Sequence, residues 1–257
     1  MLKMGKGILV KSGKEIEFIA EGGKKLGRVK KALIDKVREG VSAKEIDDLA
    51  NKLIKKEGGK ASFKMVPRYR WATCVNVNDG VVHGIPKKEI VFKKGDVVSV
   101  DVGMFYKGFH TDTSFTVGLE VSKEINKFLD TGKIALKKAI QEAKMGKKIF
   151  DISEAIESTL KQAGYFPIRA LVGHGVGKDL HEEPQIPCFT SGKASSSPEI
   201  PEGAVLAIEV MYAMGSGDVK LDGDGWTIST SDGTISGLFE ETVAVTKNGS
   251  IIITGIS

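Results

Sequence analysis

Cysteine is nearly absent from this chain, which has two among its 257 residues. Cys74 and Cys188 stand far apart and form no CxxC pair, which argues against a disulfide framework and a zinc finger. Hydrophobic runs such as Ile251-Ile252-Ile253 are far too short to cross a bilayer. The first six residues lack the apolar stretch and cleavage site of a secretory leader. We therefore expect a protein of the reducing cytoplasm with no membrane partner.

Aromatic residues make up only 7% of the chain, and they do not alternate with basic side chains as a stacking platform for nucleic acid requires. The net charge of +5 hides an asymmetry: residues 1–70 hold 19 Lys and Arg against 9 Asp and Glu, and the remainder holds 19 against 24. The basic part is either a solvated face of helices or a surface for a polyanion such as ribosomal RNA, in transient ribosome association. The acidic remainder supplies the carboxylates that hard divalent cations need.

Apolar spacing and glycine positions predict one order of elements, used twice. A long helix over about 15–38 precedes a second over about 42–57, whose capping box is Ser42 with Glu45. Another long helix covers about 122–145, and a second capping box, Asp151 with Glu154, begins the helix that ends near Gly164. Strands are predicted over 73–78, 97–105, 109–117, 204–212, 226–229 and 239–246.

This repetition predicts an α+β fold in a single domain over 1–257, with pseudo-repeat halves of approximately 14–120 and 121–250. Two copies are too few for a solenoid, and a pseudo-twofold domain is the better interpretation. Such folds tend to place a site between their halves. The segment 192–201, rich in serine and proline, is predicted to be a surface loop.

The hairpin over 97–117 contains the first candidate ligands, Asp101 and Asp112. Side chains alternate along a strand, so Asp101 points away from the valines at 98, 100 and 102. Folding back at residues 106–108 is expected to set Asp101 nearly opposite Asp112, with Cβ atoms about 5 Å apart. Two carboxylates at that separation repel unless one is protonated or a cation lies between them. A solvated polar face stays open as the alternative, but the apolar setting favours a metal.

Further candidates are histidines and glutamates in unusual positions. His174 lies between glycines, which allow a close approach of backbone and ligand. His181 begins His181-Glu182-Glu183-Pro184, which is not the HExxH zinc motif because a second histidine is missing. Glu209 and Glu240 interrupt apolar strands, where a charge is costly unless it is paired or coordinated. An edge strand facing water is the open alternative for each.

Together, these residues resemble the pita-bread metallopeptidases, and within them the type I methionine aminopeptidases. The resemblance covers nearly the whole chain. Its motifs are Val82-His83-Gly84-Ile85-Pro86, Asp101-Val102, Gly108-Phe109-His110-Thr111-Asp112-Thr113, Gly173-His174-Gly175-Val176-Gly177, His181-Glu182-Glu183-Pro184-Gln185, Ile208-Glu209, Asp224-Gly225-Trp226-Thr227 and Phe239-Glu240. It implies a pita-bread fold around a central antiparallel sheet, and removal of the N-terminal methionine from nascent polypeptides.

The resemblance also implies roles for the ligands. Asp101 would bind one divalent ion, His174 and Glu209 the other, and Asp112 and Glu240 would bridge the two. Two such ions would activate a water and polarise the scissile carbonyl. Glu209 would transfer the proton and His181 would stabilise the oxyanion, while His83 would bind the substrate backbone. The ligand types suit Co, Mn, Fe or Zn.

The remaining implied residues form the substrate pocket and a second cation site. The methionine pocket would consist of Tyr69, Cys74, Trp226, Leu180 and Val66. Asn78, Gly80 and Ser236 match positions that hold Na or K in some relatives. The chain departs from the usual family pattern at Glu241, Val210, Thr111, Leu180 and Val66.

Two alternatives to methionine removal stay open from the sequence. The first is an X-Pro aminopeptidase or dipeptidase of the same fold, because these enzymes share the five ligands. The second is a non-catalytic binding module on the same scaffold. We further expect a monomer whose partners are the N-termini of nascent peptides.

Overall fold

The computed structural model describes residues 7–256, and within them four α-helices and thirteen strands. The helices are α1 (Gly13–Lys36), α2 (Ala43–Lys56), α3 (Lys123–Glu142) and α4 (Ile149–Gln162). The strands are β1 (Lys60–Ala61), β2 (Thr73–Val77), β3 (Gly80–Val82), β4 (Val97–Tyr106), β5 (Phe109–Gly118), β6 (Phe166–Pro167), β7 (Val172–Gly175), β8 (Glu182–Pro187), β9 (Val205–Ala213), β10 (Val219–Leu221), β11 (Ile228–Thr230), β12 (Ser236–Thr246) and β13 (Gly249–Ile252). No helix in this part of the chain is long and apolar enough to cross a bilayer. The prediction about a secretory leader concerns residues 1–6, which lie outside the described residues.

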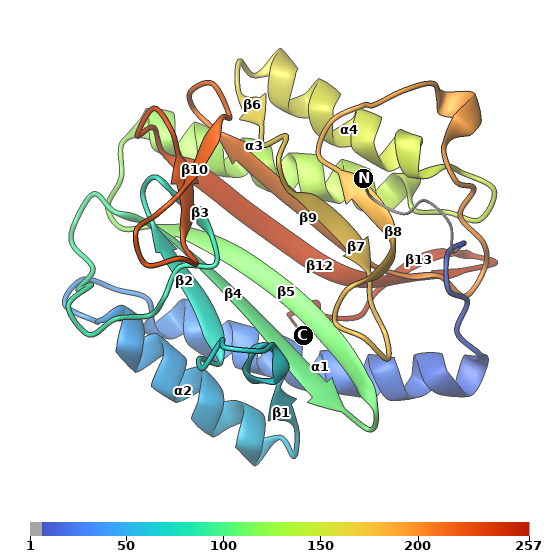
Figure 1. Ribbon diagram of the computed structural model, residues 1–257, viewed down its shortest axis with the longest axis horizontal. Coiled ribbons are helices and arrows are strands. Elements are labelled where there is room, and N and C mark those ends of the chain that lie inside the picture. Colours follow the sequence, from blue (N-terminus) through green and yellow to red (C-terminus); the bar gives the residue numbers. More distant parts are fainter. Residues whose placement is uncertain (1–6, 257) are drawn as a thin grey trace.

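One antiparallel sheet runs through the molecule in the order β1-β4-β5-β12-β9-β7-β8 (Figure 1). Strands β2, β13 and β6 extend it by pairing with β4, β12 and β9. The hairpin β4–β5 and the pair β9–β12 meet at its centre, where β5 pairs with β12. The predicted central antiparallel sheet is confirmed, and its middle joins segments that are more than 100 residues apart in the sequence.

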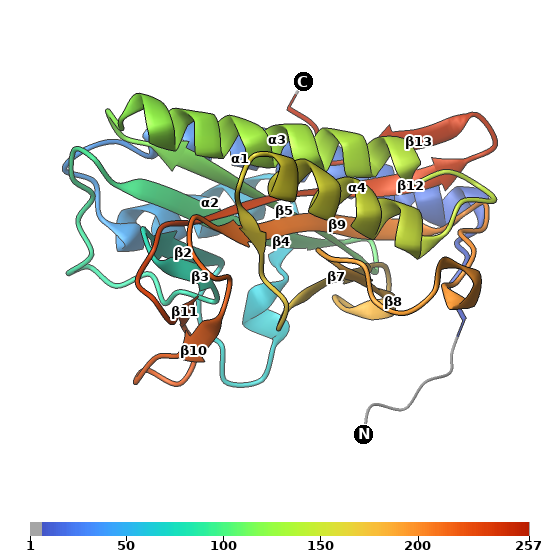
Figure 2. The same cartoon turned by 90° about the horizontal axis from the view of Figure 1, so that it is seen from above.

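The four helices lie along one side of this sheet, and the small sheet β10-β11-β3 lies on the other (Figure 2). Helices α1 and α2 bury their apolar stripes in one cluster with β4, whose Val98, Val100 and Val102 are fully buried there. Because successive side chains of a strand point to opposite faces, Asp101 and Gly103 face the side without helices. The carboxylate of Asp101 therefore lies on the side of the sheet that the helices leave uncovered.

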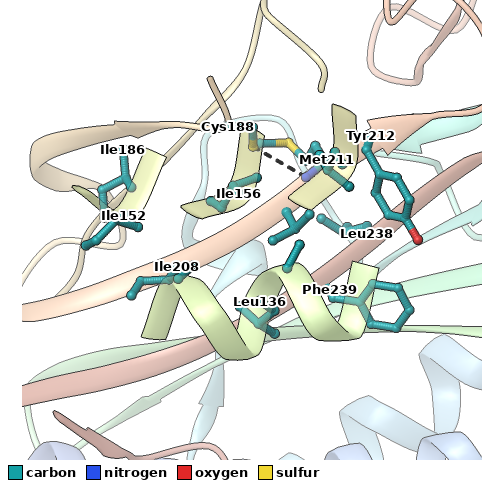
Figure 3. Packing of buried hydrophobic residues seen from close by; sticks show 14 of the residues in the cluster. Leu136, Ile152, Ile156, Ile186, Cys188, Ile208, Met211, Tyr212, Leu238 and Phe239 are labelled. Atoms are coloured by element: carbon teal, nitrogen blue, oxygen red, sulfur yellow. Dashed lines mark hydrogen bonds between the residues drawn. The ribbon is translucent and has the colours of Figure 1, made fainter. Parts of the chain in front are cut away.

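Helices α3 and α4 cover the other end of the sheet in a second, larger hydrophobic cluster (Figure 3). Leu136 of α3 and Ile156 of α4 pack there with Ile208 of β9. Cys188 is buried in this cluster, and its Sγ accepts a hydrogen bond from the backbone N–H of Met211 at 3.4 Å. The strand that carries Glu209 is thus held from behind by a continuous apolar core.

The helix caps confirm one sequence prediction and correct another. Ser42 and Glu45 form the predicted capping box of α2. The N-cap of helix α4, however, lies three residues before the predicted one, because Asp151 is the third residue of the helix and not its N-cap. The Asp151 carboxylate accepts the backbone N–H of Lys148, the actual N-cap, at 2.7 Å. An Asp near the start of a helix can be either the N-cap or the third residue, and only the backbone conformation distinguishes the two positions.

Candidate metal centre

The hairpin β4–β5 places Asp101 and Asp112 on the same face, but not directly opposite each other. Asp101 pairs with Ser114, and Asp112 pairs with Gly103. The predicted opposition was wrong by two residues. The turn consists of residues 107 and 108 alone, both at positive φ, and this two-residue turn determines the register of the whole hairpin.

The two aspartates approach each other diagonally across Gly103, which has no side chain between them. A Cβ atom at Gly103 would lie 3.2 Å from Asp112 Oδ1 and 2.8 Å from the Cβ of Ser62. Burial raises the pKa of Asp101 to about 7. Burial and then the charge of Asp101 raise the pKa of Asp112 well above its usual value. Neither carboxylate is stable as a bare anion in this position.

Glu209 and Glu240 complete a row of carboxylates across β5, β12 and β9. Glu240 pairs with Glu209 on one side and with Ser114 on the other. Burial raises the pKa of both glutamates well above the usual value, and nearby aspartates raise it further. Glu241 points to the opposite face, where it accepts a hydrogen bond from Lys30 Nζ at 2.6 Å. The structure therefore brings Glu240 and not Glu241 to the centre. Alternation allows only one of two adjacent residues there, and the family resemblance implied Glu240.

His174 reaches the same centre from β7, where it pairs with Ala207 of β9. Its Nδ1 lies 2.9 Å from the Gly175 carbonyl oxygen. A donor at Nδ1 leaves Nε2 as the acceptor, and Nε2 lies 3.9 Å from Glu209 Oε1. Burial lowers the pKa of His174 to about 3, so its imidazole is neutral. Neutral imidazole is the form that binds a metal.

The donor atoms at this centre fit a divalent cation. One ligand atom from each of Asp112, His174 and Glu240 lies within 4.8 Å of the other two. Asp101 Oδ1 is buried and has no hydrogen-bond partner in the described part of the chain. We call Asp101, Asp112, Glu209 and Glu240 the carboxylate cluster. An unpaired buried oxygen beside three more carboxyl groups and a neutral histidine is the environment in which a cation replaces repulsion by coordination.

Two further histidines stand at the rim of the centre. The His181 ring packs edge-on against the His174 ring, with centroids 4.5 Å apart. His83 adopts a positive φ of 58°, which is uncommon for a residue other than glycine. Both residues are in contact with solvent on one side. The protein atoms around the rest of each ring keep water away, and this desolvation lowers both pKa values. Each imidazole can therefore donate one hydrogen bond as a neutral group near pH 7.

An apolar cavity of about 170 Å³ opens onto the carboxylate cluster. The five residues predicted to form the methionine pocket all line it: Val66, Tyr69, Cys74, Leu180 and Trp226. The rings of Tyr69 and Trp226 meet edge-on at 5.0 Å. Phe63 and Val82 also line it, and the sequence interpretation missed Phe63. No local motif marks Phe63, which reaches the cavity because residues 63–65 form a short 3-10 turn.

The positions predicted to hold a monovalent cation also come together, outside this cavity. Ser236 donates through its backbone N–H to the Asn78 carbonyl oxygen at 2.9 Å and through Oγ to the Gly80 carbonyl oxygen at 2.7 Å. A carbonyl oxygen has two lone pairs, so each can accept a second partner. Binding of Na or K by these residues stays a prediction.

A sequence model of metallopeptidase family M24 matches residues 17–247 of this chain. The methionine aminopeptidase of Aquifex aeolicus is 40% identical over 250 residues, which cover 95% of this chain and 97% of that protein. Methionine aminopeptidase 1 of Bacillus subtilis is 38% identical over 250 residues, which cover 97% of this chain and 100% of that protein. Both matches extend over nearly the full length of the two chains.

Solved structures agree with these matches. The methionine aminopeptidase of Thermotoga maritima has a TM-score of 0.94 at 38% identity and covers 96% of this chain and 99% of its own. The prolidase of Pyrococcus furiosus has a TM-score of 0.76 at 23% identity, and 66% of that chain is covered. At this lower identity the match shows the fold alone. The pita-bread fold predicted from the sequence is thereby confirmed.

Proposed function

The chain belongs to metallopeptidase family M24, and from this membership we propose that it removes the N-terminal methionine from polypeptides by metal-dependent attack of water on the first peptide bond. The observation that carries the proposal is a single cavity of about 170 Å³ that both the carboxylate cluster and apolar side chains line. The carboxylate cluster suits a cation and a reacting water, and the apolar lining suits a single apolar side chain. The two lie next to each other, as cleavage beside a terminal methionine requires.

We propose that two divalent ions bind here, among Co, Mn, Fe and Zn. Asp101 would hold one, His174 and Glu209 the other, and Asp112 and Glu240 would be shared. When bound, these ions would supply an activated water and a polarised substrate carbonyl. The high pKa values of the carboxylates support this assignment, because they show how strongly the cluster disfavours four uncompensated negative charges.

The protein's own groups would then transfer protons and stabilise charge. Glu209 would take a proton from the attacking water and give it to the leaving amine. His181, at the rim beside His174, would donate a hydrogen bond to the developing oxyanion. His83 would donate to the substrate backbone and hold the peptide in place through the reaction.

The cavity favours methionine as the first residue of the substrate. An unbranched thioether side chain fits an irregular apolar space, and its sulfur makes favourable contacts with aromatic rings. Tyr69 and Trp226 supply two such rings. The free α-amine of the substrate would bind one of the ions held by the carboxylate cluster, which lines the same cavity. An internal peptide bond has no such group.

The two alternatives from the sequence have less support. The X-Pro aminopeptidase of Thermotoga maritima and the prolidases match at 22–24% identity, and this chain covers 61–66% of their lengths. The methionine aminopeptidases match at 28–38% identity, with 98–99% of their chains covered. A non-catalytic module has no need of five metal-binding side chains around one cavity.

The test is a peptide panel with the purified protein loaded in turn with Co, Mn, Fe or Zn. We expect release of methionine from Met-Ala-Ser, no cleavage of Ala-Pro peptides and no cleavage of N-acetyl-Met-Ala-Ser. Preferential cleavage of the Ala-Pro peptides would favour the X-Pro alternative. No cleavage with any metal, together with no retained metal after dialysis, would favour the non-catalytic one.

A further inference from the structure

Lys11 and Glu182 form an ion pair inside the protein although they lie 171 residues apart. The Lys11 side chain is 6% exposed and the Glu182 side chain 3%. Lys11 Nζ also donates to the Leu9 carbonyl oxygen at 3.1 Å. Burying two charges is costly unless each satisfies the other in good geometry. The pair therefore ties two distant segments together in one relative position.

On one side of the pair lies a short segment, residues 8–12, which we call the N-terminal strap. The backbone N–H of Lys11 donates to the Gly203 carbonyl oxygen at 2.9 Å. Val10 forms a β-bridge with Ala204, just before β9. The strap ends at Ser12, the N-cap of α1. Backbone contacts before Lys11 and the helix cap after it leave the lysine little freedom to move.

On the other side lies the turn over 176–181, which joins β7 to β8 and ends at His181. Glu182 follows His181 directly, and its Oε1 accepts the backbone N–H of Asp179 at 3.3 Å. A Cβ atom at Gly177 would lie 2.6 Å from Lys11 Cε and 2.8 Å from Glu182 Oε1. The carboxylate thus closes the turn on itself, with the lysine packed against it.

We propose that Lys11 is a positioning residue for the cleavage reaction: through Glu182 it fixes the backbone from which His181 reaches the scissile carbonyl. This inference rests on the proposed function. The His181 side chain is exposed, with its ring against the ring of His174, so its place depends on the backbone that carries it. Without the lysine, the Glu182 carboxylate would turn toward water and displace its neighbour. A misplacement of about 1 Å in an active site can cost about 100-fold in rate.

The test compares Lys11→Met with Lys178→Met in the full-length, metal-loaded protein. Lys178 lies in the same turn but is exposed, and it pairs with Glu15 at 3.6 Å. For Lys11→Met we expect kcat on Met-Ala-Ser to fall by at least about tenfold with KM within about twofold, because an oxyanion donor acts on the transition state. The metal content should stay unchanged. Lys178→Met should behave as the unmodified protein.

A double-mutant cycle that combines Lys11→Met with His181→Ala distinguishes positioning of His181 from a general structural role of Lys11. If Lys11 acts through His181, Lys11→Met should cost little further kcat once the imidazole is gone. Because Lys11→Met leaves the Glu182 carboxylate without its partner, a second variant, Lys11→Met with Glu182→Met, removes both charges and keeps an apolar filling. It should fold and still lose kcat.

Two outcomes would overturn the role of Lys11 while the unmodified protein remains active. One is an unchanged kcat in either variant. The other is an equal loss from Lys11→Met with and without His181. A failure of the unmodified protein to release methionine would instead contradict the proposed function, so the two failures are distinguishable.

Discussion

Glu209 and Glu240 lie directly opposite each other on neighbouring antiparallel strands at the centre of the sheet. Glu240 is 3% exposed, and the Glu209 side chain is 13% exposed. Directly opposed residues have Cβ atoms about 5 Å apart, and two negative charges there repel. The pair is therefore stable only when it carries a proton or faces a cation, and the same holds for the two aspartates beside it.

After a chelator has removed any bound metal, the thermal stability of the protein should fall as the pH rises. Burial raises the pKa of Asp101 to about 7, far above the value of about 4 expected in the unfolded chain. A carboxyl group with a raised folded-state pKa contributes its full stability below the unfolded value and loses it as pH rises through the folded value. In thermal unfolding, Tm of the metal-free protein should drop between about pH 4 and pH 7. This drop should be larger than that of the metal-free Asp101→Asn variant over the same window, because asparagine does not titrate. A Tm that rises across this window would contradict the assignment.

Glu240→Gln and Glu241→Gln form a matched pair of adjacent substitutions on opposite faces. For Glu240→Gln we expect methionine release to fall by at least about 100-fold, with loss of bound metal. Replacing a residue that only hydrogen-bonds to a metal ligand usually costs less, about 10- to 100-fold. Glu241→Gln should lower Tm, because it breaks the buried contact with Lys30, and should keep the metal. Metal analysis and a tripeptide assay check both. Equal metal loss in the two variants would place the centre elsewhere.

His181→Ala and His83→Ala should affect different kinetic constants. Loss of a single oxyanion donor lowers kcat by about 100- to 1,000-fold, and we expect this of His181→Ala with KM nearly unchanged. His83 would bind the substrate backbone before and during the reaction, so His83→Ala should raise KM more than it lowers kcat. Steady-state kinetics on Met-Ala-Ser distinguishes them. The reverse pattern would exchange the two roles.

Leu180→Ala should weaken methionine binding, because Leu180 lines the apolar cavity and is itself buried. A single methylene group in such a pocket is worth about 10- to 200-fold, so we expect KM for Met-Ala-Ser to rise by at least about tenfold. Leu180→Met, which conserves volume, is the control and should change KM little. An unchanged KM in Leu180→Ala would mean that the methionine side chain binds elsewhere.

Local features were predictable from the sequence where the deciding interactions are local. The cap at Ser42 was found because its partner Glu45 is three residues away. The cap of α4 was misplaced because Lys148, which has no side-chain acceptor for a cap, occupies the N-cap. The hairpin over 97–117 was found, but its register was wrong by two residues, since that depends on the conformation of the turn. The pseudo-repeat halves, approximately 14–120 and 121–250, stay a prediction.

The sequence by itself determined which residue types could bind a metal and that the adjacent Glu240 and Glu241 face opposite ways. Alternation along a strand allows only one of these two residues at the centre, and the family resemblance selected Glu240. The tertiary structure alone decided that β5, β12, β9 and β7 lie side by side and bring Asp112, Glu240, Glu209 and His174 together. It alone placed Lys11 beside Glu182. Alternation and helix capping act over a few residues, whereas the pairing of distant strands depends on how the whole chain buries its apolar faces.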